Sequence, residues 1–256
     1  MNEEDEDAED KVITFYDFPS KKDGVEGWNP FPVRIRLALK YKGIPFKTVW
    51  VEYPDVELTL KAAGIPPTTQ WPDGKPWYTL PAIVDPSTGV ALADSFAIAE
   101  YLDKTYPDKP LLMPSHTKAL QTAFNEAVLA HVRPIFPFVL IKFCGLVHPV
   151  SEEYFRRTRI VLFGKSVDEM VPQGENAKEE WKKLEEGFGK IAGWMKKEDE
   201  FVMGDTVSFA DFVIGGWLIL SRLAWGNDSK EWKEIAEWHD GRWGKLVKSL
   251  EPYYGK

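Results

Sequence analysis

The sequence has a single cysteine, Cys144, so no disulfide can form within the chain. This composition suits a reducing compartment, and we expect the cytosol. Cys144 lies in the apolar run VLIKFCGLV, which indicates a buried small hydrophobe rather than a nucleophile. The histidines lack the spacing of metal ligands, so no metal site is predicted. They are His116, His131, His148 and His239.

The chain also lacks an excess of positive charge and a long apolar segment. Its formal net charge is -8 and its pI is about 5.2, which argues against a protein that reads a nucleic-acid backbone. The apolar stretch 128–143 is interrupted by His, Arg and Pro, so neither a signal peptide nor a membrane span is predicted. No internal repeat, dinucleotide fingerprint or phosphate loop is found.

Acidic and aromatic residues are abundant. Seven of the first ten residues are acidic, and we interpret residues 1–11 as a disordered, solubilising arm. Hydrophobic residues make up 44% and aromatic residues 14% of the chain. This is enough apolar surface for a buried core together with an apolar ligand pocket.

Residues 12–107 alternate between strand and helix patterns. Strands are predicted over 12–18 and 46–53, and helices over 30–43 and 55–64. A turn-rich segment, two short strands over 80–85 and 89–94, and a helix from residue 95 follow. A β-α-β unit that continues into a hairpin and a helix is typical of a thioredoxin-like α/β layer.

The second half of the chain is predicted to be helical. A loop over 107–115 marks the boundary, and no convincing strand pattern follows it. Helices are expected over 116–132, 151–167, 176–197 and 208–225. We therefore predict a thioredoxin-like domain at 12–107 and an all-α domain at 116–256.

Two features near the hairpin suggest a binding site for an amino-acid-like ligand. Pro81 stands at a strand entrance, where a proline begins a strand or forms a turn, sometimes with a cis bond. Asp94 and Ser95 follow at the start of a helix, where unpaired N–H groups and a hydroxyl can hold a carboxylate while Asp pairs with an amine. Each feature alone also fits a plain strand start or helix cap.

With these residues the sequence resembles the cytosolic glutathione transferases over roughly residues 12–250. LPAIVD and ADSFAIAEYLDKTYP are similar to the family's glutathione site. By that resemblance, Leu80 and Pro81 bind the cysteinyl backbone, and Asp94 and Ser95 bind the γ-glutamyl end. Thr79 beside them is a weaker candidate. The resemblance also implies a homodimer.

A second motif supports the same family. GDTVSFADFVIGGWL, residues 204–218, places Ser208 and Asp211 as a capping box and Val207 and Phe212 as a hydrophobic staple. It resembles the buried capping motif in the core helix of the family's second domain. We assign it a structural role only.

The start of the first helix resembles the etherase-related fungal class called FuA. The catalytic serine of that class falls on Asn29, and its proline falls on Pro30. A glutathione thiol has a pKa of about 8.5 and must be held as thiolate to attack at neutral pH. The Asn29 amide can donate a hydrogen bond to it, although Asn before Pro is also an ordinary helix cap. Tyr16 in the first strand is the alternative donor.

The family's second substrate occupies an apolar pocket between the domains. On this sequence the resemblance suggests Phe18, Trp28, Phe31, Phe124 and Phe138, each of which can equally be core. The predicted activity is attack of the glutathione thiolate on electrophilic aromatic compounds, among them β-aryl ethers and other plant phenolics, or on peroxides. The alternative is a ligandin that binds aromatic polyphenols in the same pocket without turnover.

Overall fold

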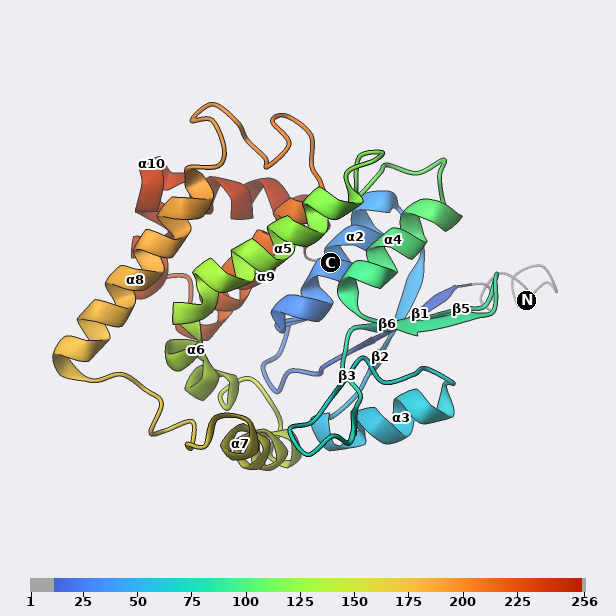
Figure 1. The fold of residues 1–256 in the computed structure, drawn as a ribbon, viewed down its shortest axis with the longest axis horizontal. Coiled ribbons are helices and arrows are strands. Elements are labelled where there is room, and N and C mark those ends of the chain that lie inside the picture. The colour runs from blue at the N-terminus through green and yellow to red at the C-terminus, as the bar shows by residue number, and fades with distance from the viewer. Residues whose placement is uncertain (1–11, 255–256) are drawn as a thin grey trace.

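A computed structural model describes residues 12–254 (Figure 1). The predicted acidic arm at 1–11 lies outside the described residues. The first half is built on a four-stranded sheet of order β2-β1-β5-β6. Its strands are β1 (Ile13–Asp17), β2 (Phe46–Trp50), β5 (Ala82–Asp85) and β6 (Val90–Ala93).

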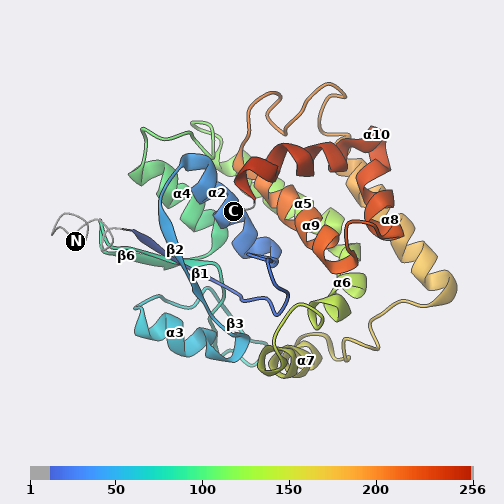
Figure 2. The same ribbon diagram turned by 180° about the vertical axis from the view of Figure 1, so that it is seen from behind.

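The sheet is mixed. β1 pairs in parallel with β2 and antiparallel with β5, and β5 pairs antiparallel with β6. Helices α2 (Pro30–Lys42) and α4 (Ser95–Thr105) cover one face, and α3 (Val56–Ala62), which follows η1 (Tyr53–Asp55), covers the other (Figures 1 and 2). This arrangement confirms the predicted thioredoxin-like layer. The turn-rich segment adds a small hairpin, β3 (Thr69–Gln70) and β4 (Pro76–Trp77), which was not predicted.

Helix α2 begins and ends as its sequence predicts. Asn29 caps its start, and the prolines occupy the first turn, where N–H groups have no helical partner. Gly43 ends it in the left-handed conformation, with φ 64°, a region that favours glycine. The chain is thereby fixed on both sides of a helix whose start borders the site described below.

The second half is helical, as predicted, and two of its helices had not been predicted. Its elements are α5 (Lys118–Val132), η2 (Arg133–Ile135), α6 (Phe136–Phe143), α7 (Pro149–Phe163), α8 (Gly174–Ala192), α9 (Phe209–Trp225), α10 (Lys230–Leu250) and η3 (Glu251–Tyr253). Two prolines, Pro134 and Pro137, obscure the periodicity of α6. Non-helical dihedral angles from Trp238 to Gly241 bend α10. The domain bounds 12–107 and 116–256 remain predictions.

Helix α9 carries the predicted capping box. The Asp211 carboxylate accepts hydrogen bonds from the Ser208 N–H at 2.8 Å and from the Val202 N–H at 2.8 Å. Both residues of the box are fully buried. The box thus fixes the start of a helix that runs through the core and packs against α2.

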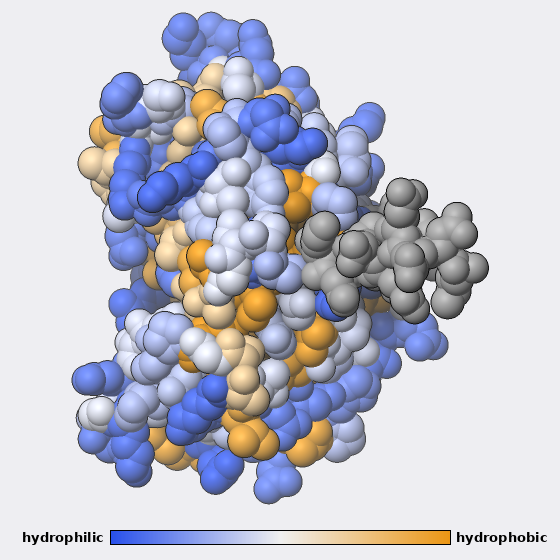
Figure 3. All heavy atoms as spheres, turned by 90° about the vertical axis from the view of Figure 1, so that its right-hand side faces the viewer, coloured by the Kyte–Doolittle hydropathy of each residue, from blue (hydrophilic) through white to orange (hydrophobic). Residues whose placement is uncertain are grey.

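Among residues 12–254, one stretch, Lys118–Phe143, is long and apolar enough to cross a membrane by length and composition alone. In the fold it is divided into α5, η2 and α6, and these pack against α8 and α9. The face at the sheet side of the molecule is mixed, with hydrophobic residues scattered between hydrophilic ones (Figure 3).

Candidate active site

A cavity of about 360 Å³ opens where the thioredoxin-like layer meets α7. Its walls come from the loop after β1, the start of α2, η1, the β3–β4 hairpin, the segment before β5, the start of α4, and α7. The lining residues are Phe18, Asn29, Phe31, Tyr53, Val56, Thr69, Trp77, Tyr78, Thr79, Leu80, Pro81, Asp94, Ser95, Tyr154 and Arg159.

Asn29 uses both ends of its side chain. Its Oδ1 accepts a hydrogen bond from the Phe31 N–H at 3.1 Å, which is the predicted helix cap. Its Nδ2 donates to the Tyr53 hydroxyl at 3.1 Å. Because an amide nitrogen carries two hydrogens, one remains for a ligand in the cavity.

Tyr53 is a site residue that the sequence analysis missed. Its ring stacks on Phe18, with centroids 4.0 Å apart and planes at 13°. Burial raises the pKa of its phenol to about 12, so the hydroxyl keeps its proton at neutral pH. Since that oxygen accepts from Asn29, its own hydrogen is available to a ligand. No sequence pattern marked Tyr53, because it lies 24 residues from Asn29 in the chain and meets it only in the tertiary fold.

The predicted proline segment forms another part of the cavity wall. The Leu80–Pro81 peptide is cis, and the Pro81 carbonyl accepts the Asp94 N–H at 3.3 Å. Within residues 12–254, the backbone N–H and C=O of Leu80 have no hydrogen-bond partner. They are therefore available to an extended peptide-like ligand. Thr79 instead pairs its hydroxyl with that of Thr68, at 2.7 Å.

Asp94 and Ser95 lie together at the start of α4. One carboxylate oxygen of Asp94 accepts hydrogen bonds from the N–H groups of Phe96 and Ala97, each at 2.9 Å, so Asp94 is a helix cap. The second oxygen accepts none of the hydrogen bonds found among the described residues. Asp94 also has φ 84°, a conformation that costs an L-residue on the order of 1–3 kcal/mol and is frequent at functional sites.

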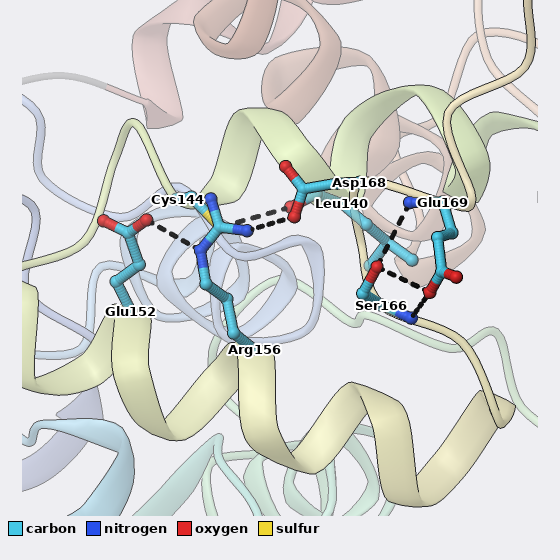
Figure 4. A network of polar contacts seen from close by, with 7 residues as sticks. All are labelled: Leu140, Cys144, Glu152, Arg156, Ser166, Asp168 and Glu169. Carbon is cyan, nitrogen blue, oxygen red and sulfur yellow. Dashed lines mark hydrogen bonds and ion pairs between the residues drawn. The ribbon is translucent and has the colours of Figure 1, made fainter.

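Helix α7 closes the cavity and is held by contacts at its start and at its middle. At its start, Glu52 lies 2.7 Å from Nδ1 of His148 and accepts a hydrogen bond from Ser151, whose Oγ in turn accepts the Tyr53 N–H at 2.9 Å. Further along, Arg156 bridges Glu152 and the loop residue Asp168, at 2.9 and 2.6 Å (Figure 4). These contacts fix the helix that presents Tyr154 and Arg159 to the cavity.

A second cavity of about 790 Å³ adjoins the first through the shared side chain of Phe31. It lies among the helices of the second half and is mostly apolar. Its lining residues are Phe31, Glu126, Leu129, Ala130, Arg133, Pro134, Phe136, Pro137, Phe163, Met170 and Glu180.

Four of the predicted residues line neither cavity. Tyr16 lies within the sheet, paired with Val49 and Ala82. Trp28 is fully buried, and its indole N–H donates to the Pro19 carbonyl at 3.0 Å.

The other two, Phe124 and Phe138, pack on Trp194 and Trp181 in aromatic clusters of the helical half. Phe136 lines the second cavity in place of Phe138, because residues two apart on a helix point in different directions.

The part of the chain that the structure describes contains no group of three or more His, Cys, Asp and Glu side chains that could hold a metal ion. Cys144 is buried, and burial raises the pKa of its thiol.

Comparisons with known proteins identify the family of this chain. Residues 28–105 match the family model of the glutathione S-transferase N-terminal domain, and residues 119–253 match that of the C-terminal domain. The chain is 33% identical to the glutathione S-transferase-like protein ustS of Aspergillus flavus, over 95% of this chain and 93% of that protein.

Solved structures are similar over almost their whole length. A glutathione S-transferase of Ceriporiopsis subvermispora, crystallised with glutathione, superposes with a TM-score of 0.90 at 43% identity, covering 94% of this chain and 97% of that one. Glutathione transferase GSTFuA3 of Phanerochaete chrysosporium superposes with a TM-score of 0.89 at 38% identity, covering 96% and 98%. The chain therefore belongs to the glutathione transferase family, with fungal members of the FuA class among its relatives.

Proposed function

We propose that this glutathione transferase binds glutathione in the smaller cavity, with the γ-glutamyl end at Asp94 and Ser95 and the cysteinyl backbone at Leu80 and Pro81. Two relatives from Ceriporiopsis subvermispora, 43% and 40% identical, are crystallised with glutathione, which supports this ligand. The free carboxylate oxygen of Asp94 suits an ammonium group. The unpaired backbone of Leu80 suits a peptide.

The thiolate is held by Asn29 together with Tyr53. The observation that carries the proposal is the 3.1 Å hydrogen bond from the Asn29 amide to the Tyr53 hydroxyl at the cavity wall. It orients the phenol so that a free amide hydrogen and the hydroxyl hydrogen can both reach one sulfur. The start of α2 adds partial positive charge. Thiolate stabilisation thus uses two neutral donors where the FuA class uses a serine.

The second substrate occupies the larger cavity, next to the thiolate at Phe31. Its apolar walls favour a flat, electrophilic aromatic compound, such as a β-aryl ether or another plant phenolic, or an organic peroxide. A ligandin is the alternative function. It is favoured by the size of the larger cavity, about 790 Å³, and by Asn29, which stands at the position of the FuA-class serine. We also propose that the protein is cytosolic, which suits a chain whose single cysteine is free. Its resemblance to the family further suggests a homodimer.

Glutathione binding is tested by thermal unfolding. A ligand that binds the folded state stabilises it by about 2.7 kcal/mol at a hundred times its Kd. We expect glutathione to raise the Tm of the wild type and to have a much smaller effect on the double variant Asp94→Ala, Ser95→Ala. A wild type that shows no shift would exclude a glutathione site in this cavity.

Thiolate stabilisation is tested with Tyr53→Phe. The thiolate absorbs in the near ultraviolet, so a pH titration of the glutathione complex gives the thiol pKa. Loss of the hydroxyl donor should raise that pKa by about one unit, which lowers the thiolate fraction about tenfold at neutral pH. An unchanged pKa and an unchanged low conjugation rate, together with tight binding of aromatic polyphenols, would favour the ligandin.

A further inference from the structure

Arg159 is a cationic side chain in the cavity wall that has no acidic partner. It projects from α7, and no carboxylate of the described residues lies within ion-pair distance of it. Its Nε atom is buried without a hydrogen-bond partner. The guanidinium makes one hydrogen bond, from Nη2 to the Thr158 Oγ1 at the long distance of 3.4 Å, and lies 4.3 Å from the Phe155 ring centroid.

Of the other buried cations, Arg34 lines neither cavity and donates a hydrogen bond to Asn125 Oδ1 at 3.0 Å, and two are matched by carboxylates. Arg36 lies 2.8 Å from Asp17, and Lys42 lies 2.8 Å from Asp103. Burial of a charge without a counter-charge is costly, and buried charges are normally paired. Desolvation lowers the pKa of Arg159, and its electrostatic neighbours are the phenols of Tyr53 and Tyr154 rather than an acid. The guanidinium of Arg159 therefore lines the cavity without a counter-charge from the described residues.

We propose that Arg159 binds an anionic group, a carboxylate in the first instance, on a ligand that occupies this cavity. The planar guanidinium offers two parallel N–H donors to a carboxylate, a stronger contact than a neutral hydrogen bond. The inference rests on the proposed function, since it concerns the same cavity. Two sources carry this chemistry: the glycyl end of glutathione, and an acidic aromatic second substrate.

The cavity wall then carries both signs of charge. Asp94 provides a carboxylate from the start of α4, and Arg159 provides a guanidinium from α7. A ligand with an ammonium and a carboxylate, or a pair of ligands that together carry them, matches this arrangement. An aromatic acid bound by Arg159 lies beside Tyr53 and Tyr154, whose rings supply stacking surfaces.

The test compares acids with their neutral esters. Calorimetry gives the Kd of glutathione and of its glycyl ethyl ester, and of cinnamate and methyl cinnamate, for the wild type and Arg159→Gln. We expect Arg159→Gln to weaken at least one acid by about 10- to 100-fold, as for a lost hydrogen bond to a charged group. The corresponding ester should change less than about threefold.

Control variants separate charge from folding. Arg157→Gln removes the same charge from the same helix at an exposed position and should leave both acids within about twofold. Arg159→Lys keeps the charge and should lie between wild type and Arg159→Gln. If Arg159→Gln does not fold, Arg159→Lys still tests the site, because it replaces the planar fork by a single donor group.

The pattern of losses identifies the source of the anion. A selective loss for glutathione assigns its glycyl carboxylate to Arg159, and a selective loss for cinnamate assigns an acidic second substrate. If neither acid is weakened more than its ester, Arg159 is not an anion receptor. A wild type that binds no glutathione contradicts the proposed function, whereas the cinnamate pair still decides the role of Arg159.

Discussion

Asn29 and Asp94 each start a helix with one oxygen and leave the rest of the side chain to the cavity. The alternative readings of these residues as plain caps or as site residues are therefore compatible. A cap fixes the rotamer of the side chain, and a fixed rotamer holds the second polar atom in place for a ligand. Capping is in this sense a positioning device for the candidate site.

This double use predicts a separation of stability from chemistry at Asn29. Asn29→Asp keeps the capping oxygen, so the free energy of unfolding should change by less than about 0.5 kcal/mol, whereas Asn29→Ala should lose about 0.5–2 kcal/mol. Both variants remove the amide donor, and Asn29→Asp also adds negative charge, so the pKa of bound glutathione should rise in both. Denaturant titration and the thiolate absorbance measure the two effects. If the thiol pKa of glutathione bound to Asn29→Asp equals that in the wild type, the amide is not a donor to the thiolate.

Asp211 should give the protein a pH-dependent component of stability. Burial raises the pKa of its carboxyl from 3.8 to about 6 in the folded protein. The folded state thus binds this proton more tightly, so the contribution is fully present below about pH 4 and is lost as the pH rises through about 6.

The measurement compares wild type with Asp211→Asn, in which this titration is absent. Relative to Asp211→Asn, the free energy of unfolding of the wild type should fall by up to about 3 kcal/mol between about pH 4 and pH 7. A difference that does not vary with pH would show that the hydrogen bonds to the carboxylate offset its burial.

At the scale of elements, α2 and α9 form the contact on which the site depends. Gly216 of α9 lies against the backbone of Pro30: a Cβ at this position would stand 2.5 Å from the Pro30 carbonyl oxygen. A shift of either backbone would be costly, because α9 is fully buried around Gly216 and α2 begins at Pro30. A glycine in α9 thereby determines where the start of α2, and Asn29 with it, lies.

We expect Gly216→Ala to destabilise the fold by about 1–3 kcal/mol through overpacking, and to weaken glutathione binding by displacing Asn29. Gly193→Ala is the matched control. Its Cβ would meet only ordinary contacts at 3.4 Å, and alanine is favoured over glycine in helical conformation. Chemical denaturation measures the free energy of unfolding of both variants, and a glutathione titration measures their Kd. Equal stabilities of the two variants would contradict the close approach of Gly216 to Pro30.

At the scale of the whole molecule, Glu52, His148 and Ser151 join the two halves beside the cavity. Glu52 follows β2, and the other two residues stand at the start of α7. Ser151 also accepts the backbone N–H of Tyr53. The position of the proposed thiolate donor is thus set by a contact between the halves rather than within either one.

Ser151→Ala should therefore cost about 1–3 kcal/mol of stability, because it leaves a partly buried N–H without its partner. It should also raise the thiol pKa of bound glutathione, and its effect should not add to that of Tyr53→Phe, since both act on one donor. Ser249→Ala removes an exposed hydrogen bond to Glu200 and serves as control. Additive effects in the double variant would separate the clamp from the donor.

The sequence by itself determined the thioredoxin-like layer, the helical second half, the capping box and the spacing of Pro81 with Asp94 and Ser95. These features are local: alternation, helical period and caps act over a few residues, and each is legible along the chain. Helices α6 and α10 were not predicted, because prolines and a non-helical bend interrupt the helical period on which such a prediction depends.

Only the tertiary structure decided which side chains meet. Tyr53, Tyr154 and Arg159 reach the cavity through sheet pairing and the docking of α7, over separations in sequence that no local pattern encodes. For the same reason Phe136 lines the second cavity while Phe124 and Phe138 pack elsewhere. The backbone scaffold of the site follows from local preferences, whereas its donors and its unmatched cation follow from packing between segments that are distant in the chain.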